Sequence, residues 1–434
     1  MKPKVNIFWF RRDLRVQDNR GLYEALRSGN PVLPIFIFDK SILTKLKDNK
    51  DSRVSFIYES IKELKKEFNK ASSDLIVFYS TPDKVFEKLT KDFNINSVFA
   101  NEDYEPKSIL RDSKIKSFLK KKNINFKLFK DHVIFSKTEV VKNDNHPYTV
   151  FTPYKNKWLQ LLSPIDYKSL PSEKLLNDSL KIKETKLLTL KDLNFKENIS
   201  PIIKRTIPTK IIKDYDQTRD IPSLNGTSLL GIHLRFGTIS IRKCVQIALK
   251  LNMAWLSELI WRDFFSQIIF NFPHSATSEF KEKYSQIKWL NNKSHFNKWK
   301  KGLTGYPLVD AGMRELLSTG HMHNRVRMVT ASFLVKHLLI DWKWGEKYFA
   351  EKLLDYDLAS NIGNWQWVAG SGCDAAPYFR VFNPTRQLER FDPKYIYVKK
   401  WVPEFDTEDY PKPIIEHKFA SKRAIETYKI ALSK

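Results

Sequence analysis

The chain has 434 residues, and its 75 Lys and Arg against 49 Asp and Glu give a formal net charge of +26. At roughly 150 residues per domain, this length predicts two or three domains with sizeable cores. The content of 42% hydrophobic and 13% aromatic residues excludes a disordered polycation. No run reaches the ~20 apolar residues of a membrane span, and the N-terminus leads into a strand-like segment rather than a signal peptide. We therefore expect a cytoplasmic protein with no membrane contact.

The positive charge has two interpretations. Lys and Arg that neutralise phosphates supply sequence-independent affinity for nucleic acid, so the charge is typical of a protein with a polyanionic partner. Lys, Asn and Ile are also abundant along the whole chain, and a compositional bias of this kind raises the charge of solvated faces without any partner. Charge alone leaves both interpretations open.

A metal site has little support in the sequence. The two cysteines, Cys244 and Cys373, lie far apart and predict neither a zinc cluster nor a disulfide framework. His321 and His323 are two positions apart, which does not match the i, i+4 spacing of a metal-binding pair on a helix. We expect no metal ion.

The N-terminal part of the chain alternates short apolar runs with amphipathic stretches. The apolar runs are residues 5–10, 32–38, 75–79 and 97–100, and the amphipathic stretches are residues 53–68, 82–92 and 107–121. This alternation predicts a doubly wound α/β domain with a parallel sheet, which we place at residues 1–132. A dinucleotide-binding domain would carry G-x-G-x-x-G after its first strand, but only Gly21 and Gly29 precede Gly226, so an NAD-type domain is disfavoured.

Residues 133–208 read as an interdomain connector, because they are rich in Lys, Asn and Ser, lack glycine and contain Pro164, Pro171 and Pro201. Residues 209–434 show helical patterns without a strand-like segment, which predicts an all-α domain. Nine of the eleven tryptophans lie in the last 180 residues. Such a domain is a candidate for stacking on a flat ligand or on bases, although any single Trp is equally explained as core filling.

Residues 253–272 predict an apolar helix with few charges. Glu258 and Arg262 are one turn apart on it, with Trp255 and Trp261 close to them. One interpretation is a polar lining in a pocket walled by indoles. The alternative is an ordinary Glu258–Arg262 pair that seals the helix surface.

Residues 321–336 place Asn324 and Met328 on one helix face, with Arg327 beside them. An Asn side chain offers a donor and an acceptor to a base edge or a flavin-like ring, and Met is an adaptable apolar contact. Ordinary packing is the alternative for each residue alone.

Residues 355–384 form a polar, turn-rich segment that contains Asp355, Asp357, Asp374 and Asn361. Interleaved aromatic residues argue against disorder, and long irregular segments of this kind are usually functional. The carboxylates are also explained as helix caps. On residue types alone, this half of the chain binds something planar and polar.

Residues 225–228, Asn-Gly-Thr-Ser, precede an apolar run at residues 229–236. The pattern predicts a helix that begins with Thr227 or Ser228 near its N-terminus. Hydroxyls and free backbone N–H groups at such a position suit a phosphate, and simple N-capping is the alternative.

Six segments, taken in order, resemble the photolyase/cryptochrome family over nearly the whole chain. They are FWFRRDLRVQDN at 8–19, GTSLLGIHLRFGTIS at 226–240, WLSELIWRDFF at 255–265, TGYPLVDAGMREL at 304–316, HMHNRVRMVTASF at 321–333 and the stretch at 355–384. The resemblance implies an N-terminal α/β antenna domain and a C-terminal helical domain that holds FAD and binds UV-damaged DNA. It is strongest to the photolyases that repair cyclobutane pyrimidine dimers with light; the alternatives are a cryptochrome-type photoreceptor and a photolyase for (6-4) photoproducts.

The resemblance also implies which residues bind FAD. The phosphate side would be formed by Tyr215, Thr227, Ser228, Leu229, Leu230 and Gly231, with Arg262 as a further contact. Arg327 and Asp355 match the ion pair beside the flavin ring, and Asp357 matches a ring or ribose contact. Asn361 matches the residue that faces flavin N5, where plant cryptochromes typically carry Asp, and this favours repair.

Electron transfer and lesion binding are implied in the same way. Trp289, Trp342 and Trp365 match the family's electron-transfer triad, with Trp365 proximal to FAD and Trp289 outermost. The residues that match the lesion-binding side are Trp261 and Trp367, which would embrace a flipped lesion, and Glu258, Asn324 and Met328, which would touch its bases. Further candidate DNA contacts are Arg219, Arg325, Arg380 and Gln387.

Individual residues indicate which lesion is repaired and which antenna chromophore is bound. Members that act on (6-4) photoproducts carry a histidine pair where this chain has Asn324 and Met328, so a cyclobutane dimer is the expected substrate. We also expect the enzyme to be a monomer. Two departures, His321 for a common Trp and Gly231-Ile232 for a common Ser-Pro, leave FAD binding intact. Lys107-Ser108 replaces the Asn-Glu of folate-binding members, so a second, antenna chromophore would be a deazaflavin or another flavin, or is absent.

Overall fold

The protein is described from a computed structural model that defines residues 3–198 and 205–433. Residues 199–204 of the predicted connector lie outside this description. The chain forms two compact units, each assembled from three stretches: residues 1–139, 161–207 and 229–250 in the first, and residues 140–160, 208–228 and 251–434 in the second. The boundaries at residues 132 and 208 drawn from the sequence stay a prediction.

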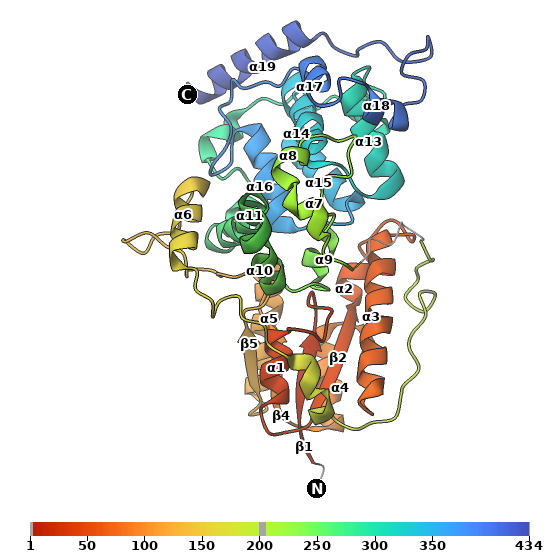
Figure 1. Ribbon diagram of the computed structural model, residues 1–434, viewed down its shortest axis with the longest axis vertical. Helices are drawn as coiled ribbons and strands as arrows, with labels where there is room; N and C mark the ends of the chain where they lie inside the picture. Colours follow the sequence, from red (N-terminus) through yellow and green to blue (C-terminus); the bar gives the residue numbers. More distant parts are fainter. Residues whose placement is uncertain (1–2, 199–204, 434) are drawn as a thin grey trace. The chain divides into compact units, whose positions relative to one another are not determined.

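The first unit is built on a parallel sheet of five strands (Figure 1). The strands lie in the order β3-β2-β1-β4-β5, with the bounds β1 Lys4–Phe10, β2 Val32–Asp39, β3 Ile76–Ser80, β4 Asn94–Asn101 and β5 Asn125–Phe129. The helices of this unit include α1 Arg20–Leu26, α2 Lys40–Leu43, α3 Ser52–Lys70, α4 Pro82–Asp92, α5 Pro106–Lys120, α9 Gly231–Phe236 and α10 Ile241–Leu251. The predicted doubly wound α/β architecture is confirmed.

Alternate side chains of the central strands form two separate cores. Phe8 and Phe10 of β1 pack with residues of α1 and α3, whereas Ile7 and Trp9 pack with residues of α4 and α5. Because helices cover both faces, β1 and β2 are buried almost throughout and read as continuous apolar runs. The edge strand β5 was missed in the sequence because NFKLF is half-exposed and contains Lys127.

A buried ion network joins distant parts of the first unit. Asp131 accepts hydrogen bonds from Arg15 at 2.7 Å and from Arg242 at 2.8 Å. Arg242 also pairs with Asp18 at 2.9 Å. Burial alone raises the pKa of Asp131, but the two guanidinium groups outweigh it and hold that pKa below its ordinary value. The network therefore ties the loop after β1 to helix α10.

The second unit is helical in its described residues, as predicted. Its helices are α6 Phe151–Leu161, α7 Thr209–Lys213, α8 Tyr215–Thr218, α11 Met253–Asn271, α12 Lys293–Lys301, α13 Pro307–Thr319, α14 Asn324–Ser332, α15 Trp342–Lys352, α16 Leu358–Ala369, α17 Pro384–Phe391, α18 Ile396–Trp401 and α19 His417–Leu432. Short 3₁₀ turns lie at η1 Ser172–Asp178 in the first unit and at η2 Pro273–Ala276 and η3 Glu282–Gln286 in the second, and η4 Phe333–His337 is a π-helical turn.

Helix α6 lies within the segment predicted as a connector and was not identified from the sequence. Phe151, Tyr154 and Trp158 are buried at helical spacing, and the Trp158 indole donates to Oδ2 of Asp263 on α11 at 3.0 Å. The Lys and Asn residues between them are solvent-facing, and they masked the apolar stripe in the sequence.

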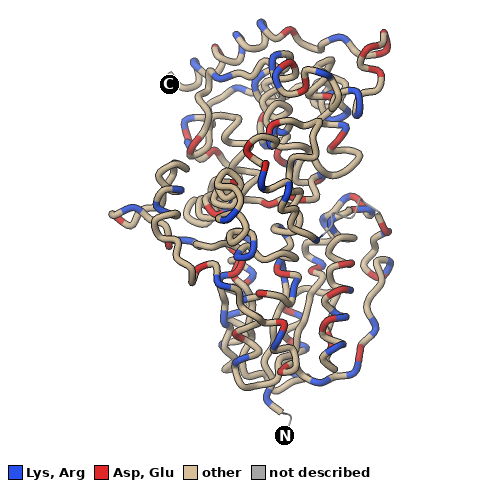
Figure 2. The backbone as a smooth tube through the Cα atoms, viewed as in Figure 1, with Lys and Arg blue, Asp and Glu red and all other residues tan. Residues whose placement is uncertain are grey.

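The charges do not gather in one segment. Figure 2 shows Lys and Arg spread along both units. Among the described residues, no helix combines the length and apolar character needed to cross a bilayer.

Candidate functional site

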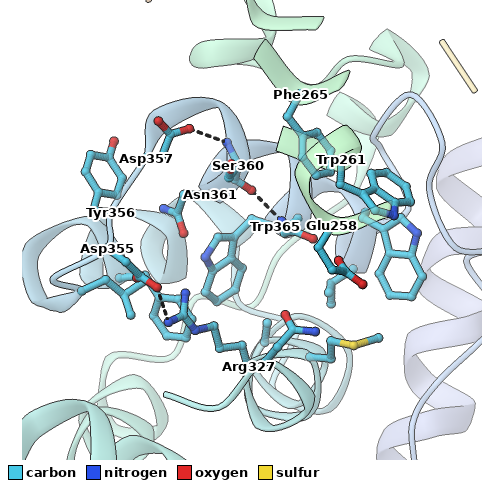
Figure 3. Close-up of a pocket in the computed structure, with 18 residues that line it drawn as sticks. Glu258, Trp261, Phe265, Arg327, Asp355, Tyr356, Asp357, Ser360, Asn361 and Trp365 are labelled. Carbon is cyan, nitrogen blue, oxygen red and sulfur yellow. Dashed lines mark hydrogen bonds and ion pairs between the residues drawn. The ribbon is translucent and has the colours of Figure 1, made fainter. Parts of the chain in front are cut away.

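A cavity of about 320 Å³ lies within the second unit, walled by α11, α14, α15 and α16. Ten of the residues predicted from the sequence line it: Glu258, Trp261, Asn324, Arg327, Met328, Asp355, Asp357, Asn361, Trp365 and Trp367. Figure 3 shows Asp355 and Asp357 at one end, Glu258 and Trp261 at the other, and Trp365 between them. Segments more than 60 residues apart in the sequence therefore meet at one cavity.

Close backbone contacts fix the rings that wall this cavity. A Cβ atom on Gly345 of α15 would lie 2.1 Å from the Trp365 ring, and a Cβ atom on Gly363 of α16 would lie 2.2 Å from the Phe265 ring. Neither position has room for a side chain, so each aromatic ring packs directly on a helix backbone. Asp357 caps α16 by accepting a hydrogen bond from the Ser360 backbone at 3.2 Å, which fixes the start of the helix.

Arg327 and Asp355 form an ion pair at one end of the cavity. Nη2 of Arg327 donates to Oδ2 of Asp355 at 2.9 Å, and Nε donates to the Met322 carbonyl at 2.7 Å. Burial alone raises the pKa of Asp355, but Arg327 outweighs it and keeps that pKa below its ordinary value. Within the described chain, Oδ1 of Asp355 is buried without a hydrogen-bond partner. A buried carboxylate oxygen in this state is suited to an N–H donor from a bound ligand.

Asn361 is oriented by an acid that was not identified from the sequence. Its Nδ2 donates to the carbonyl and to Oε1 of Glu346, at 3.2 and 3.0 Å. Burial raises the pKa of Glu346, against the hydrogen bonds from Asn361 and Tyr356. Because its amide nitrogen donates to Glu346, Asn361 can offer its amide oxygen to a ligand as an uncharged acceptor. Glu346 carries no motif of its own, and only the packing of α15 on α16 reveals it.

The opposite end of the cavity is aromatic and carries one acid. Trp261 stacks on Phe151 with ring centroids 3.6 Å apart and planes 6° apart. Glu258 pairs with Arg219 at 2.7 Å, so its observed partner comes from the end of α8. Burial raises the pKa of Glu258 despite this arginine. Phe151 was not identified from the sequence because it lay inside the predicted connector.

The other candidate DNA contacts do not line the cavity. Arg325 pairs with Asp220 at 2.7 Å and its guanidinium lies 4.4 Å from the Phe391 ring centroid. Arg380 is exposed beside Phe382, and Oε1 of Gln387 is buried without a partner in the described structure. Arg380 is therefore exposed, whereas Arg325 and Gln387 are half-buried.

A helix follows Thr227 and Ser228 within the expected apolar run, but it starts three residues after Ser228. Helix α9 begins at Gly231 with Leu230 as its N-cap, and Leu229 before it adopts a left-handed backbone, φ +53°. That conformation interrupts a continuous helix.

The residues of the predicted phosphate side are divided between the units. Tyr215, Thr227 and Ser228 belong to the second unit, and Leu229, Leu230 and Gly231 to the first. Burial raises the pKa of Tyr215. Neither these residues nor Arg262 line the cavity described above.

The three triad tryptophans differ in exposure. Trp365 and Trp342 are buried, whereas Trp289 is half-buried and lies against Tyr428 with ring centroids 6.0 Å apart. Trp342 begins α15, and Gly345, which contacts Trp365, follows one turn later. Trp365 also packs edge-on against Phe349 at 5.0 Å and Trp299 at 6.4 Å.

Comparison with known proteins agrees with this fold. Residues 6–174 match the DNA photolyase family model, and residues 255–408 match that of the FAD binding domain of DNA photolyase. A deoxyribodipyrimidine photo-lyase from Buchnera aphidicola is 33% identical, over 98% of this chain and 97% of its own.

Two solved structures share the fold. A bacterial class III photolyase from Agrobacterium tumefaciens has a TM-score of 0.87 and 30% identity, covering 100% of this chain and 99% of its own. An archaeal photolyase from Sulfolobus tokodaii with two FAD molecules has a TM-score of 0.83 and 35% identity, covering 98% of this chain and 100% of its own. The protein is therefore a two-unit flavoprotein with an α/β and a helical part. It belongs to the photolyase/cryptochrome family.

The cavity residues fit the FAD that this family binds. The buried Oδ1 of Asp355 needs a donor, Arg327 supplies a cation beside it, and Asn361 adds a neutral polar group on the same side. Trp365 and the other aromatic residues supply flat apolar contacts. In the described residues, no group of three or more His, Cys, Asp or Glu is arranged to hold a metal ion.

Proposed function

We propose that the protein is a deoxyribodipyrimidine photolyase, which uses light to split cyclobutane pyrimidine dimers in DNA. The single observation that carries this proposal is the two-ended cavity. One end holds Arg327, Asp355 and Asn361, and the other holds Trp261 and Asn324. A flavin and a flipped pyrimidine dimer therefore have adjoining sites of suitable chemistry.

The chain's own residues prepare a site for electron transfer. Reduced FAD, held by Arg327, Asp355 and Asn361, would supply light-driven donation of one electron to the dimer and its return, with no net oxidation. Arg327 holds a fixed positive charge where a reduced flavin carries negative charge. Asn361 offers a hydrogen-bonding group without a charge, held in orientation by Glu346. The aromatic walls exclude water from the contact between the two ligands.

The opposite end is proposed to receive the lesion. Photolyases extrude their target bases from the duplex, and a damaged, poorly stacked pair lowers this cost of a few kcal/mol. Trp261, backed by Phe151, and Trp367 offer indole surfaces for stacking. Glu258, Asn324 and Met328 supply polar and adaptable contacts to the base edges. Arg219, Arg325, Arg380 and Gln387 are proposed to contact the DNA around the lesion.

Photoreduction of oxidised FAD is proposed to use Trp365, Trp342 and Trp289 in that order. Their exposure supports this order, because Trp365 lines the cavity and Trp289 is half-buried. The phosphate side of FAD is assigned to Tyr215, Thr227, Ser228, Leu229, Leu230 and Gly231, with Arg262 and Asp357 as further contacts. We also propose that the protein acts as a monomer in the cytoplasm. A second chromophore is proposed in the first unit.

The proposal is tested with an oligonucleotide that carries one cyclobutane dimer and a matched one that carries a (6-4) photoproduct. Protein loaded with reduced FAD should remove the first lesion under blue light and not in the dark, and leave the second intact. Removal of the (6-4) photoproduct would assign the other lesion. Tight FAD binding with no repair of either lesion would favour a photoreceptor.

A further inference from the structure

Glu279 is a buried acid outside the cavity described above. It lies between η2 and η3 and is 7% exposed. Its Oε1 accepts a hydrogen bond from the indole Nε1 of Trp342 at 3.2 Å and another from Nζ of Lys343 at 2.7 Å. The acid therefore touches the middle member of the proposed tryptophan triad through the polar atom of its ring.

The position of Glu279 is set by the helix that carries Trp365. Gln366, the next residue on α16, donates from Nε2 to the carbonyls of Ser275 and Ser278 at 2.9 and 3.0 Å. Its Oε1 accepts from the backbone N–H of Phe280, the residue after Glu279, at 2.7 Å. Gln366 is itself buried. One side chain therefore holds the backbone on both sides of Glu279 in register with Trp365.

The charge at this point is negative at neutral pH. Burial alone raises the pKa of Glu279, but the hydrogen bond and charge of Lys343, a backbone hydrogen bond and the Trp342 hydrogen bond together outweigh it, and the pKa lies below its ordinary value. Lys343 acts on the indole in the opposite sense, because its ammonium group lies 5.4 Å from the Trp342 ring centroid. The carboxylate, however, makes the direct hydrogen bond to the indole N–H, and this charge-assisted bond strengthens when the ring becomes positive.

We propose that Glu279 is a positioning residue for light-driven electron transfer, which holds the Trp342 indole N–H and favours the loss of one electron from that ring. The inference rests on the proposed place of Trp342 in the triad. One electron passes from Trp342 to oxidised Trp365, and the positive charge moves to Trp342. The indole proton stays on nitrogen, shared with the Glu279 carboxylate, and no covalent bond forms or breaks. A thiol reductant in solution finally supplies the electron through Trp289.

Two substitutions with opposite electrostatic effects test this inference. Glu279→Gln keeps the size and an acceptor oxygen but removes the negative charge, so photoreduction of bound oxidised FAD should slow about tenfold, equivalent to about 1.4 kcal/mol in the barrier. Lys343→Gln removes the positive charge near the ring and should leave photoreduction as fast as in the unaltered protein or faster. Glu282→Gln, the same change at an exposed position three residues further along, is the matched control.

A second readout does not depend on catalysis. In a ¹⁵N spectrum of the indole groups of the FAD-loaded protein, the Trp342 signal is identified by its loss in Trp342→Phe. Glu279→Gln should shift this signal upfield, because a charge-assisted hydrogen bond becomes a neutral one. Glu282→Gln should leave it in place.

The outcomes separate this inference from the triad itself. If Trp342→Phe stops photoreduction while Glu279→Gln leaves its rate unchanged, the inference on Glu279 is overturned and the triad stands. Equal slowing in Glu279→Gln and Lys343→Gln also overturns it, since that result indicates lost packing rather than charge. Normal photoreduction in Trp342→Phe instead contradicts the assignment of Trp342.

Discussion

Arg327 holds only one oxygen of Asp355, at 2.9 Å, and the other oxygen is buried without a hydrogen-bond partner in the described structure. The pair thus neutralises the Asp355 carboxylate while keeping its buried oxygen as an acceptor for FAD. Both side chains are partly exposed, at 24% and 21%, so solvent moderates the strength of the pair.

Arg327→Met is expected to reduce FAD retention sharply and to destabilise the second unit by about 1–3 kcal/mol, because it leaves the Asp355 carboxylate without its cation. Flavin absorbance per protein after gel filtration and denaturant unfolding measure the two effects. Arg20→Met, which removes an exposed pair with Glu24 in the first unit, is the control and should change neither. Full FAD content in Arg327→Met would contradict the placement of the flavin beside this pair.

Asn324→Ala should weaken binding and repair of a dimer-containing oligonucleotide with little loss of FAD. Removing one side-chain hydrogen bond to a base corresponds to about 1.4 kcal/mol, or roughly a tenfold fall in affinity. Lesion affinity is measured in the dark by fluorescence anisotropy, and FAD content by absorbance on the same sample. Complete loss of FAD would place Asn324 on the flavin side instead.

Gly345→Ala tests the close contact between α15 and Trp365. The added Cβ atom would lie 2.1 Å from the Trp365 ring, so we expect a loss of about 1–3 kcal/mol in the free energy of unfolding and weaker FAD binding. Lys347→Ala, at an exposed position of the same helix, should preserve both properties. An unchanged stability in Gly345→Ala would show that the ring moves aside without cost.

Lys336 of the π-helical turn η4 is buried in the second unit. Its Nζ donates to the carbonyls of Tyr378 and Ala369 at 3.2 and 3.4 Å and lies 3.6 Å from the Tyr428 ring centroid. Burial lowers its pKa from 10.5 to about 7. Between these two values the unfolded chain binds a proton that the folded chain does not, so this group makes stability rise with pH across that window.

Lys336→Met should therefore remove part of the pH dependence. The free energy of unfolding of the variant, relative to that of the unaltered protein, should be highest near about pH 7. It should fall from there towards about pH 9, by at most about 1.4 kcal/mol per pH unit. Denaturant unfolding at a series of pH values measures the difference. Lys347→Met should run parallel to the unaltered protein, and a parallel curve for Lys336→Met would contradict the lowered pKa.

The helices and strands that could be predicted from the sequence are those with a clear apolar pattern in their own residues. Strand β1 is buried on both faces and reads as a continuous apolar run, and the apolar sequence of α11 marks a largely buried helix. The edge strand β5 and helix α6 carry polar residues on their exposed sides, and their apolar residues were too few to stand out.

At the site, residues within one segment could be predicted, but partners from other segments could not. Glu258 was weighed as a partner of Arg262 four positions away, and its observed partner is Arg219, which packing brings from a different helix. Glu346 on Asn361 and Glu279 on Trp342 arise in the same way. The spacing of residues in the sequence does not predict such contacts, because they depend on the angle at which two helices pack.

The first unit is assembled from three separate stretches of the chain, and this affects when it can be completed during synthesis. Asp131 is held by Arg15 and by Arg242, and Arg242 lies beyond a stretch that belongs to the second unit. The nascent sheet can associate early, but its buried carboxylate lacks one of its two cations until the ribosome has passed Arg242. A chain that ends before this point therefore carries an undercompensated buried charge, which is a large penalty for a folded domain and a reason for its removal by proteases.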